Sequence, residues 1–189
     1  MIHSYLDSPL GPLLLTGDGQ SLTGLYTDQH GRLPTELGPR VDEEFAEARA
    51  QLDQYFAGVR DVFDLPLNAP GTAFQQAVWH ALRQIRYGST MTYRQVAEQV
   101  GNPKAVRAVG SANSRNPISI IVPCHRVLGS DGALIGYAGG FHAKRWLLDH
   151  EFRTAANLAH REPAATPQLT VTVRQPSLGL PVPSRRFSA

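Results

Sequence analysis

Short apolar runs separated by turn residues dominate the first part of the chain. Leu13 to Thr16 and Leu22 to Tyr26 flank the sequence Gly17-Asp18-Gly19-Gln20. Turn residues between two apolar runs are typical of a β-hairpin, so we predict two paired strands here. A further strand is expected over Asp61 to Asn68.

The pattern changes to a helical period after Asp42. Apolar residues three or four positions apart predict one amphipathic helix that ends before Gly58, with a buried stripe formed by Val41, Phe45, Ala48, Leu52 and Tyr55. Pro66, Pro70 and Gly71 then mark a linker.

Two capping boxes open the next segment. Thr72 with Gln75 precedes a helix whose buried stripe is Phe74, Val78, Leu82 and Ile85, and Thr92 with Gln95 precedes a shorter helix over about 93–100. Gly101 predicts a tight turn. Asn102 and Pro103 suit the cap and the first position of a helix that runs to about Ser114.

Two short helices joined by a turn that contains glycine resemble a helix-turn-helix. Its second helix would turn Val106 and Val109 inward. The polar residues it would present are Lys104, Arg107, Ser111 and Arg115, and the small residues that permit close approach to a partner are Ala105, Ala108, Gly110 and Ala112.

Apolar and glycine-rich stretches alternate in the following fifty residues. The continuous apolar run Ile118 to Val122 predicts a buried strand. Leu128 to Leu134 reads as a turn between short strands, residues 136–140 as a flexible loop, and Phe141 to Phe152 as a last helix.

These patterns divide the chain into an N-terminal α/β module (1–69), a mainly helical module (70–153) and a proline-rich tail (154–189). We expect the tail to be disordered, with Gln168 to Arg174 as its one candidate strand.

Composition narrows the class of protein. The chain has 189 residues, of which 42% are hydrophobic and 18% charged, as in a globular protein. No apolar run is long enough to cross a bilayer, and the N-terminus lacks the pattern of a secretory signal. One cysteine cannot form a disulfide within the chain and fits a reducing interior. We expect a cytoplasmic protein with no membrane partner.

Charge is distributed unevenly along the chain. Residues 1–70 carry four Arg against eleven Asp and Glu, whereas residues 71–153 carry ten Lys and Arg against four acids. A basic second module indicates a polyanionic partner, although ordinary surface variation explains the same numbers equally well.

Cys124 is the candidate for chemistry. His125 and Arg126 follow it directly, and cationic neighbours favour the reactive thiolate. A free cysteine is often only a small buried hydrophobe, so this residue pair alone does not establish catalysis.

The surrounding residues supply the missing specificity. Asn116-Pro117, Pro123-Cys124-His125-Arg126-Val127, Gly136-Tyr137-Ala138-Gly139-Gly140 and Glu151 together closely resemble the O6-alkylguanine-DNA alkyltransferases. The resemblance is strong over Thr72 to Phe152 and weak over the first module. It implies a ribonuclease H-like first module and a winged helix-turn-helix second module.

The resemblance also implies direct-reversal repair. The alkyl group of O6-alkylguanine, and of O4-alkylthymine, would pass irreversibly to Cys124 after the base is flipped out of duplex DNA, without a cofactor. His125 would accept the thiol proton through a water, Glu151 would orient His125, Asn116 would brace the active-site turn, and Tyr93 would rotate the phosphate and donate a proton to the leaving guanine.

Further residues take implied roles in binding. The pocket would consist of Val127, Tyr137, Ala138 and Gly139, with carbonyls of Cys124 and Val127 for the guanine amine. Arg107 would enter the duplex as a finger. The protein would bind the minor groove as a monomer. The other residues in contact with DNA would be Arg94, Lys104, Ala105, Ala108, Ser111 and Arg115. Asn113 stands where some relatives have an apolar pocket residue.

Other classes of protein fit parts of this pattern. A non-catalytic alkyltransferase-like lesion binder would lack the cysteine, and a winged-helix regulator would not need Cys124, His125, Asn116 and Glu151 together. A cysteine hydrolase would need an oxyanion-type glycine loop beside Cys124, which we do not find. The first module has no cysteine, so we expect no structural zinc.

Overall fold

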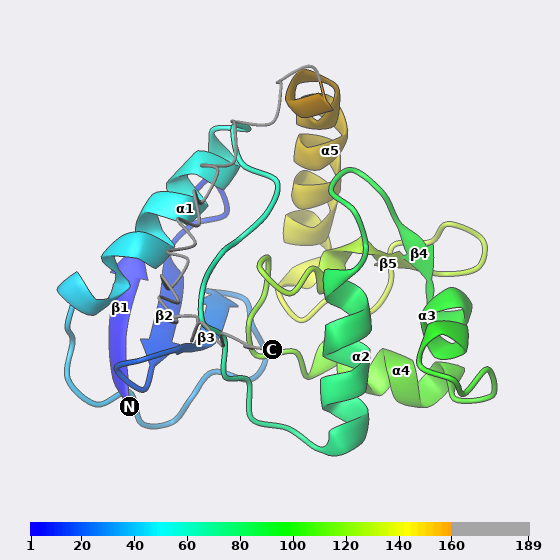
Figure 1. Ribbon diagram of the computed structural model, residues 1–189, viewed down its shortest axis with the longest axis horizontal. Coiled ribbons are helices and arrows are strands. Elements are labelled where there is room, and N and C mark those ends of the chain that lie inside the picture. The colour runs from blue at the N-terminus through cyan, green and yellow to red at the C-terminus, as the bar shows by residue number, and fades with distance from the viewer. Residues whose placement is uncertain (160–189) are drawn as a thin grey trace, which may run out of the picture.

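The computed structural model describes residues 1–159, which form two modules side by side (Figure 1). The N-terminal module contains an antiparallel sheet in the order β1 (Ile2–Leu6), β2 (Leu13–Gly17) and β3 (Leu22–Thr27). The predicted hairpin β2–β3 is confirmed. Strand β1 was not predicted, because its inward positions include the polar Ser4, whose hydroxyl donates to Asp42.

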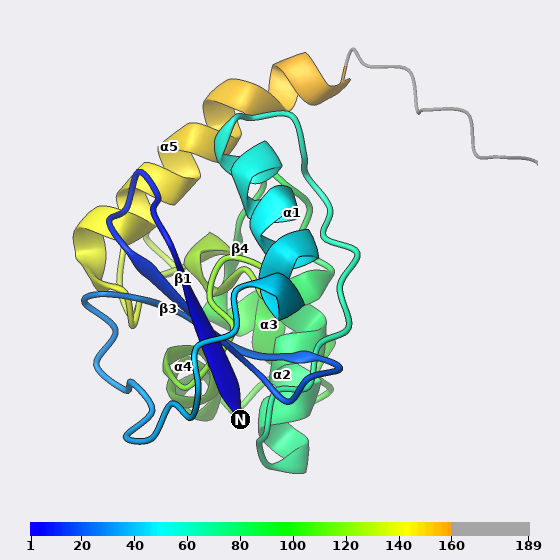
Figure 2. The ribbon, with the colours of Figure 1, turned by 90° about the vertical axis from the view of Figure 1, so that its left-hand side faces the viewer.

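Helix α1 (Ala46–Phe56) follows a short 3-10 turn, η1 (Glu43–Phe45), and lies alongside the sheet (Figure 2). Its predicted stripe is buried from Phe45 onward, in one core with the leucines of β2 and β3. Gly58 adopts a positive φ of 70° and ends the segment. The strand expected over 61–68 is reduced to a single bridge between Leu22 and Leu67.

The C-terminal module is mainly helical. It contains α2 (Ala73–Arg83), α3 (Tyr93–Gln99), α4 (Val106–Ser114) and α5 (Gly140–Ala159), with a two-stranded parallel pair formed by β4 (Met91–Thr92) and β5 (Val127–Leu128). Both predicted capping boxes are present. Figure 1 shows α2, α3 and α4 opposite the sheet, with α5 above the junction of the modules. The predicted two-module fold is therefore confirmed.

Two helix boundaries differ from the sequence prediction. Helix α4 begins at Val106 rather than Pro103, because the Asn102 carbonyl accepts from Ala105 N in a turn and no side chain caps the helix. Helix α5 continues to Ala159, so residues 154–159 are helical and not part of a disordered tail. The Thr154 hydroxyl supports this extension because it donates to the His150 carbonyl and forms a hydrogen bond with the Tyr87 hydroxyl. The rest of the predicted tail, including Gln168 to Arg174, lies outside the described residues.

The predicted strand over Ile118 to Val122 is wrong, although its residues are buried. Among residues 1–159, this segment forms a single bridge, between Leu25 of β3 and Ile118. It consists of hydrogen bonds from Leu25 N to Pro117 O and from Ser119 N to Leu25 O. Ile120 then adopts a φ of 71°, outside the range of a strand, and Val122 N turns back to the Ile118 carbonyl. The sheet of the first module thus anchors the segment that leads into Cys124.

The cap of α2 offers a test of the local fold. Thr72→Ala removes the hydroxyl that accepts from Gln75 N, so we expect a loss of about 1 kcal/mol in the free energy of unfolding in urea. Thr72→Ser keeps the acceptor and should unfold like the parent protein. Equal unfolding of all three proteins would contradict this role of the cap.

Candidate active site

Cys124 lies at the start of a 3-10 turn, η2 (Cys124–Arg126), that connects the buried segment before it to β5. The side chain is only 1% exposed. Because the backbone is not extended here, Cys124 and His125 are not held on opposite faces of a strand. The turn after Pro123 therefore permits both side chains to serve one site.

His125 and Glu151 form a buried pair. His125 Nε2 lies 2.7 Å from Glu151 Oε1, and the side chains are 0% and 1% exposed. The other ring nitrogen, Nδ1, is buried and contacts no hydrogen-bond partner among residues 1–159. The helix α5 thus delivers the acid that sequence spacing alone could not place beside His125.

Glu151 accepts more than one hydrogen bond at each carboxylate oxygen. Besides His125, it receives the Tyr55 hydroxyl at 2.8 Å, two guanidinium bonds from Arg126 at 2.8 and 2.9 Å, and Gly88 N at 3.2 Å. Burial disfavours the charged form, but His125 and Arg126 outweigh it and lower the pKa of Glu151. The carboxylate is therefore ionised at neutral pH.

Asn116 braces the turn around the sulfur. Its Nδ2 donates to the Val122 carbonyl at 2.8 Å and to Cys124 Sγ at 3.1 Å, while its Oδ1 accepts from Ile118 N at 3.0 Å. One amide side chain thus ties three points of the segment that carries the sulfur.

The electrostatics differ from the expectation of an ionised sulfur. Burial raises the pKa of Cys124, opposed by the Asn116 hydrogen bond and the Lys144 charge, and burial likewise lowers the pKa of His125. Arg126 cannot stabilise a thiolate freely, because its guanidinium binds Glu151 and the Ile85 carbonyl. The resting site consequently holds a neutral thiol and a neutral imidazole.

Two tyrosines lie in the surroundings of the reactive turn. The Tyr93 hydroxyl donates to the Ile135 carbonyl at 3.0 Å, and burial raises its pKa to about 12. The Tyr137 ring lies edge-on to His125 at 6.4 Å between centroids, and its pKa is raised well above the usual value by burial. After burial, the charge on an ionised Cys124 is the next cause that raises both pKa values.

The pocket loop is fixed to both modules. A Cβ at Gly136 would meet the Tyr93 hydroxyl at 2.5 Å, and one at Gly139 would meet the Thr27 hydroxyl of β3 at 2.6 Å. Gly136 also has a φ of 67°, which favours glycine. Residues 136–139 therefore fit against their neighbours only without side chains at these two positions.

The carbonyls expected to bind a guanine amine already have partners. The Cys124 carbonyl accepts from Asn113 Nδ2 at 3.4 Å, and the Val127 carbonyl accepts from Lys144 Nζ at 2.6 Å. Each carbonyl keeps a second lone pair. Asn113 is buried and also donates to Gly136 O at 3.2 Å, so it braces the loop from the side where the sequence indicated a pocket wall.

The helix-turn-helix presents the polar residues named above. Arg94, Lys104, Arg107, Ala108, Ser111 and Arg115 are exposed, Ala105 is half-buried, and Val109 packs inward as predicted. Arg115, the residue after α4, donates back to Ser111 on that helix. A cavity of about 450 Å³ opens on this face between Tyr93, Arg107 and Gly136, so it adjoins the start of the predicted pocket loop.

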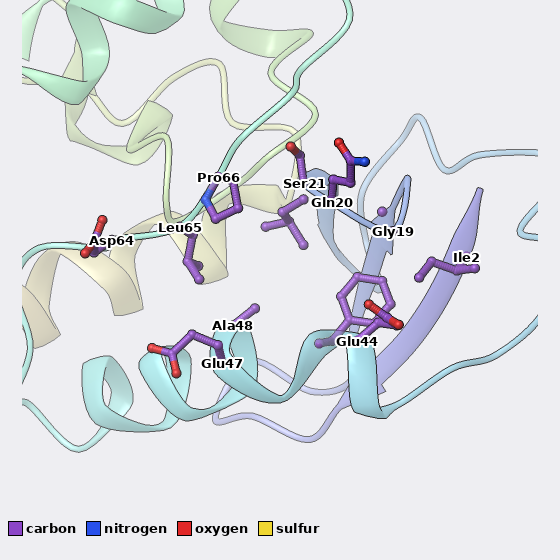
Figure 3. Close-up of a pocket in the computed structure, with 13 residues that line it drawn as sticks. Ile2, Gly19, Gln20, Ser21, Glu44, Glu47, Ala48, Asp64, Leu65 and Pro66 are labelled. Atoms are coloured by element: carbon purple, nitrogen blue, oxygen red, sulfur yellow. The ribbon is translucent and has the colours of Figure 1, made fainter.

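A second cavity, of about 210 Å³, lies in the N-terminal module (Figure 3). Glu44, Glu47 and Asp64 lie at its edge, and none of the residues that surround Cys124 lines it. Within residues 1–159, no group of three potential metal ligands forms, and no helix is long and apolar enough to cross a membrane.

Comparison with known proteins places this geometry in a family. The model of the 6-O-methylguanine DNA methyltransferase ribonuclease-like domain matches residues 1–69, and that of the DNA-binding domain of the same enzymes matches residues 73–153. The chain therefore belongs to the 6-O-methylguanine DNA methyltransferase family.

Individual relatives agree with this assignment. A methylated-DNA–protein-cysteine methyltransferase of Mycobacterium leprae is 54% identical over 153 residues, which cover 80% of this chain and 93% of the relative. A methylated-DNA–protein-cysteine methyltransferase of Methanosarcina acetivorans is 48% identical over 155 residues, which cover 80% of this chain and 98% of the relative. The crystal structure of Mycobacterium tuberculosis OGT in complex with DNA matches with a TM-score of 0.74 at 46% identity, covering 82% of this chain and 94% of that one.

Sequence reasoning missed two groups around the site. Tyr55 was predicted only as part of a buried stripe, and Lys144 carried no signal in the sequence. Lys144 is nevertheless 1% exposed, bonds the carbonyls of Val127 and Ile135 at 2.6 Å each, and has a pKa lowered to about 8 by burial.

Removing the charge of Glu151 tests the buried pair. Glu151→Gln leaves the buried Arg126 without a counter-charge, so we expect a loss of roughly 3–5 kcal/mol in the free energy of unfolding at pH 7. Because folding lowers the pKa of Glu151, its ionised carboxylate stabilises the folded state fully only above the unfolded-state pKa of about 4.3. This stabilisation declines as the pH falls below that value. The difference between the two proteins in urea unfolding should shrink below that pH, and a constant difference would contradict this assignment.

Proposed function

We propose that this protein reverses O6-alkylguanine, and O4-alkylthymine, in duplex DNA by taking the alkyl group onto Cys124. The observation that carries the proposal is the buried pair of His125 and Glu151 directly after Cys124 in the chain, with Asn116 donating to the sulfur. A lesion binder without chemistry would have no use for a thiol beside this buried pair.

Proton transfer comes first in the proposed mechanism. His125 Nδ1 is the free basic nitrogen, and Glu151 on Nε2 stabilises the imidazolium that forms when the thiol proton arrives through a water. Asn116 donates to the sulfur and so favours the thiolate. The ion pair is thus made during the reaction rather than stored in the resting protein.

Alkyl transfer then exchanges two bonds. The thiolate attacks the alkyl carbon, an S–C bond forms, and the bond from that carbon to guanine O6 breaks with its electrons left on the base. Tyr93, whose raised pKa keeps it protonated, donates toward the leaving guanine. The product is a thioether, so each protein molecule reacts once.

Access to the sulfur requires the base to leave the duplex. Arg107 on α4 is exposed beside the apolar cavity next to Tyr93 and Gly136, which suits a side chain that fills the space of a flipped base. The small residues Ala105 and Ala108 allow α4 to approach a minor groove closely. The flipped base would then meet Val127, Tyr137, Ala138 and Gly139.

We infer further that the protein acts as a monomer in the cytoplasm. One chain contains every group of the proposed mechanism, and its single thiol needs a reducing interior to remain free.

Mass spectrometry tests the transfer itself. After incubation with O6-methylguanine duplex, the intact protein should gain the mass of one methylene group, located on Cys124. Cys124→Ala should gain no mass and still bind the modified duplex. A methyl group that stays on DNA under excess protein would refute the transferase function.

Comparing two substrates tests the finger. Arg107→Ala should slow the reaction with methylated duplex at least about tenfold, because flipping loses its support, while the reaction with free O6-alkylguanine base stays unchanged. Lys104→Ala serves as a matched control that removes one exposed cation from the same face. Equal losses on duplex and free base would remove the finger role of Arg107.

A further inference from the structure

We propose that Tyr55, on the N-terminal module, is a positioning residue that sets the basicity of His125 through the carboxylate of Glu151. This inference rests on the proposed function, since it concerns the proton acceptor of that reaction. It gives the first module a part in the chemistry, beyond its part in the core.

The contact is direct and wholly buried. Tyr55 lies on α1 and Glu151 on α5, 96 positions apart, and the hydroxyl reaches Glu151 Oε1 at 2.8 Å. His125 Nε2 contacts the same oxygen at 2.7 Å. Both ring systems therefore compete for the charge of one carboxylate oxygen.

The direction of this hydrogen bond is fixed. An ionised carboxylate only accepts, so the phenol donates. Burial and the nearby Glu151 charge raise the pKa of Tyr55 well above its usual value, which keeps the donor proton in place. Donation draws negative charge from Oε1 and leaves less of it to stabilise an imidazolium on His125.

Tyr55 cannot turn away from the carboxylate. Its ring packs against Phe56, Phe63, Tyr87 and His150, and His150 Nε2 contacts the Tyr55 carbonyl at 2.8 Å. Packing alone does not need the hydroxyl, because a phenylalanine ring fills the same space. Arg126 already donates to the same oxygen, so the carboxylate is not left unpaired without Tyr55.

The remaining ionisable groups around the pair stay constant in the test. They come from η2, α5, α2–β4 and the pocket loop, and are Arg126, Cys124, Lys144, His150, Tyr87 and Tyr137. None of these residues is substituted when only the Tyr55 hydroxyl is removed.

The experiment compares Tyr55→Phe with Tyr87→Phe. Tyr87 belongs to the same aromatic cluster, but its hydroxyl bonds Thr154 rather than Glu151. Single-turnover methyl transfer from duplex DNA is measured against pH. Because His125 must be neutral to accept the proton, a more basic His125 moves the acid limb of the profile to higher pH.

We expect Tyr55→Phe to move the acid limb upward by about 0.5 to 1 pH unit, and Tyr87→Phe to leave it in place. A fluorotyrosine at position 55 donates more strongly and should move the limb downward. An unmoved limb in folded Tyr55→Phe, or equal shifts in both phenylalanine variants, would overturn the proposal.

A second measurement separates this proposal from the proposed function. The imidazole of His125 is titrated by NMR without DNA, and its pKa should rise in Tyr55→Phe. If the parent protein transfers no methyl group, the proposed function fails while this titration still tests Tyr55. An unchanged His125 pKa in a protein that does transfer methyl groups refutes Tyr55 alone.

Discussion

The structure depends on one buried carboxylate. Glu151 binds His125, Arg126, Tyr55 and the backbone at Gly88, so it connects α5 with η2, α1 and the turn after α2. A buried charge persists only when it is paired and fully hydrogen-bonded. These partners meet that requirement, and the same geometry that keeps Glu151 charged also fixes the imidazole beside Cys124.

The N-terminal module contributes to the site at three places. Strand β3 anchors the segment before the cysteine through Leu25. The Thr27 hydroxyl leaves no space for a side chain at Gly139, and the Tyr55 hydroxyl donates to the Glu151 carboxylate. The interface between the modules therefore surrounds the reactive turn rather than lying apart from it. This placement explains why a compact sheet and one helix accompany the DNA-binding module, since removing them would uncover the turn and leave Glu151 with one donor fewer.

The sequence predicted the elements whose signals are local. The two capping boxes and the stripe of α1 depend on residues three or four apart, and all appear in the structure. The strand prediction for Ile118 to Val122 failed because a buried irregular turn requires the same continuous apolar run as a buried strand. Likewise, the Cys-His-Arg motif indicated the candidate site, but the partners Tyr55 and Lys144 follow from contacts between distant segments that no local pattern records.

A nucleophile that is used once gains from being neutral until its substrate arrives. The thiolate, not the thiol, is the form that oxidants and stray electrophiles attack. Burial raises the pKa of Cys124, and burial lowers that of His125, so neither group is charged at rest. In the proposed mechanism, Glu151 and Asn116 stabilise the ion pair once the proton moves. The cost of this arrangement is a slower intrinsic thiol, which a flipped base would offset in the proposed mechanism by holding the alkyl carbon against the sulfur.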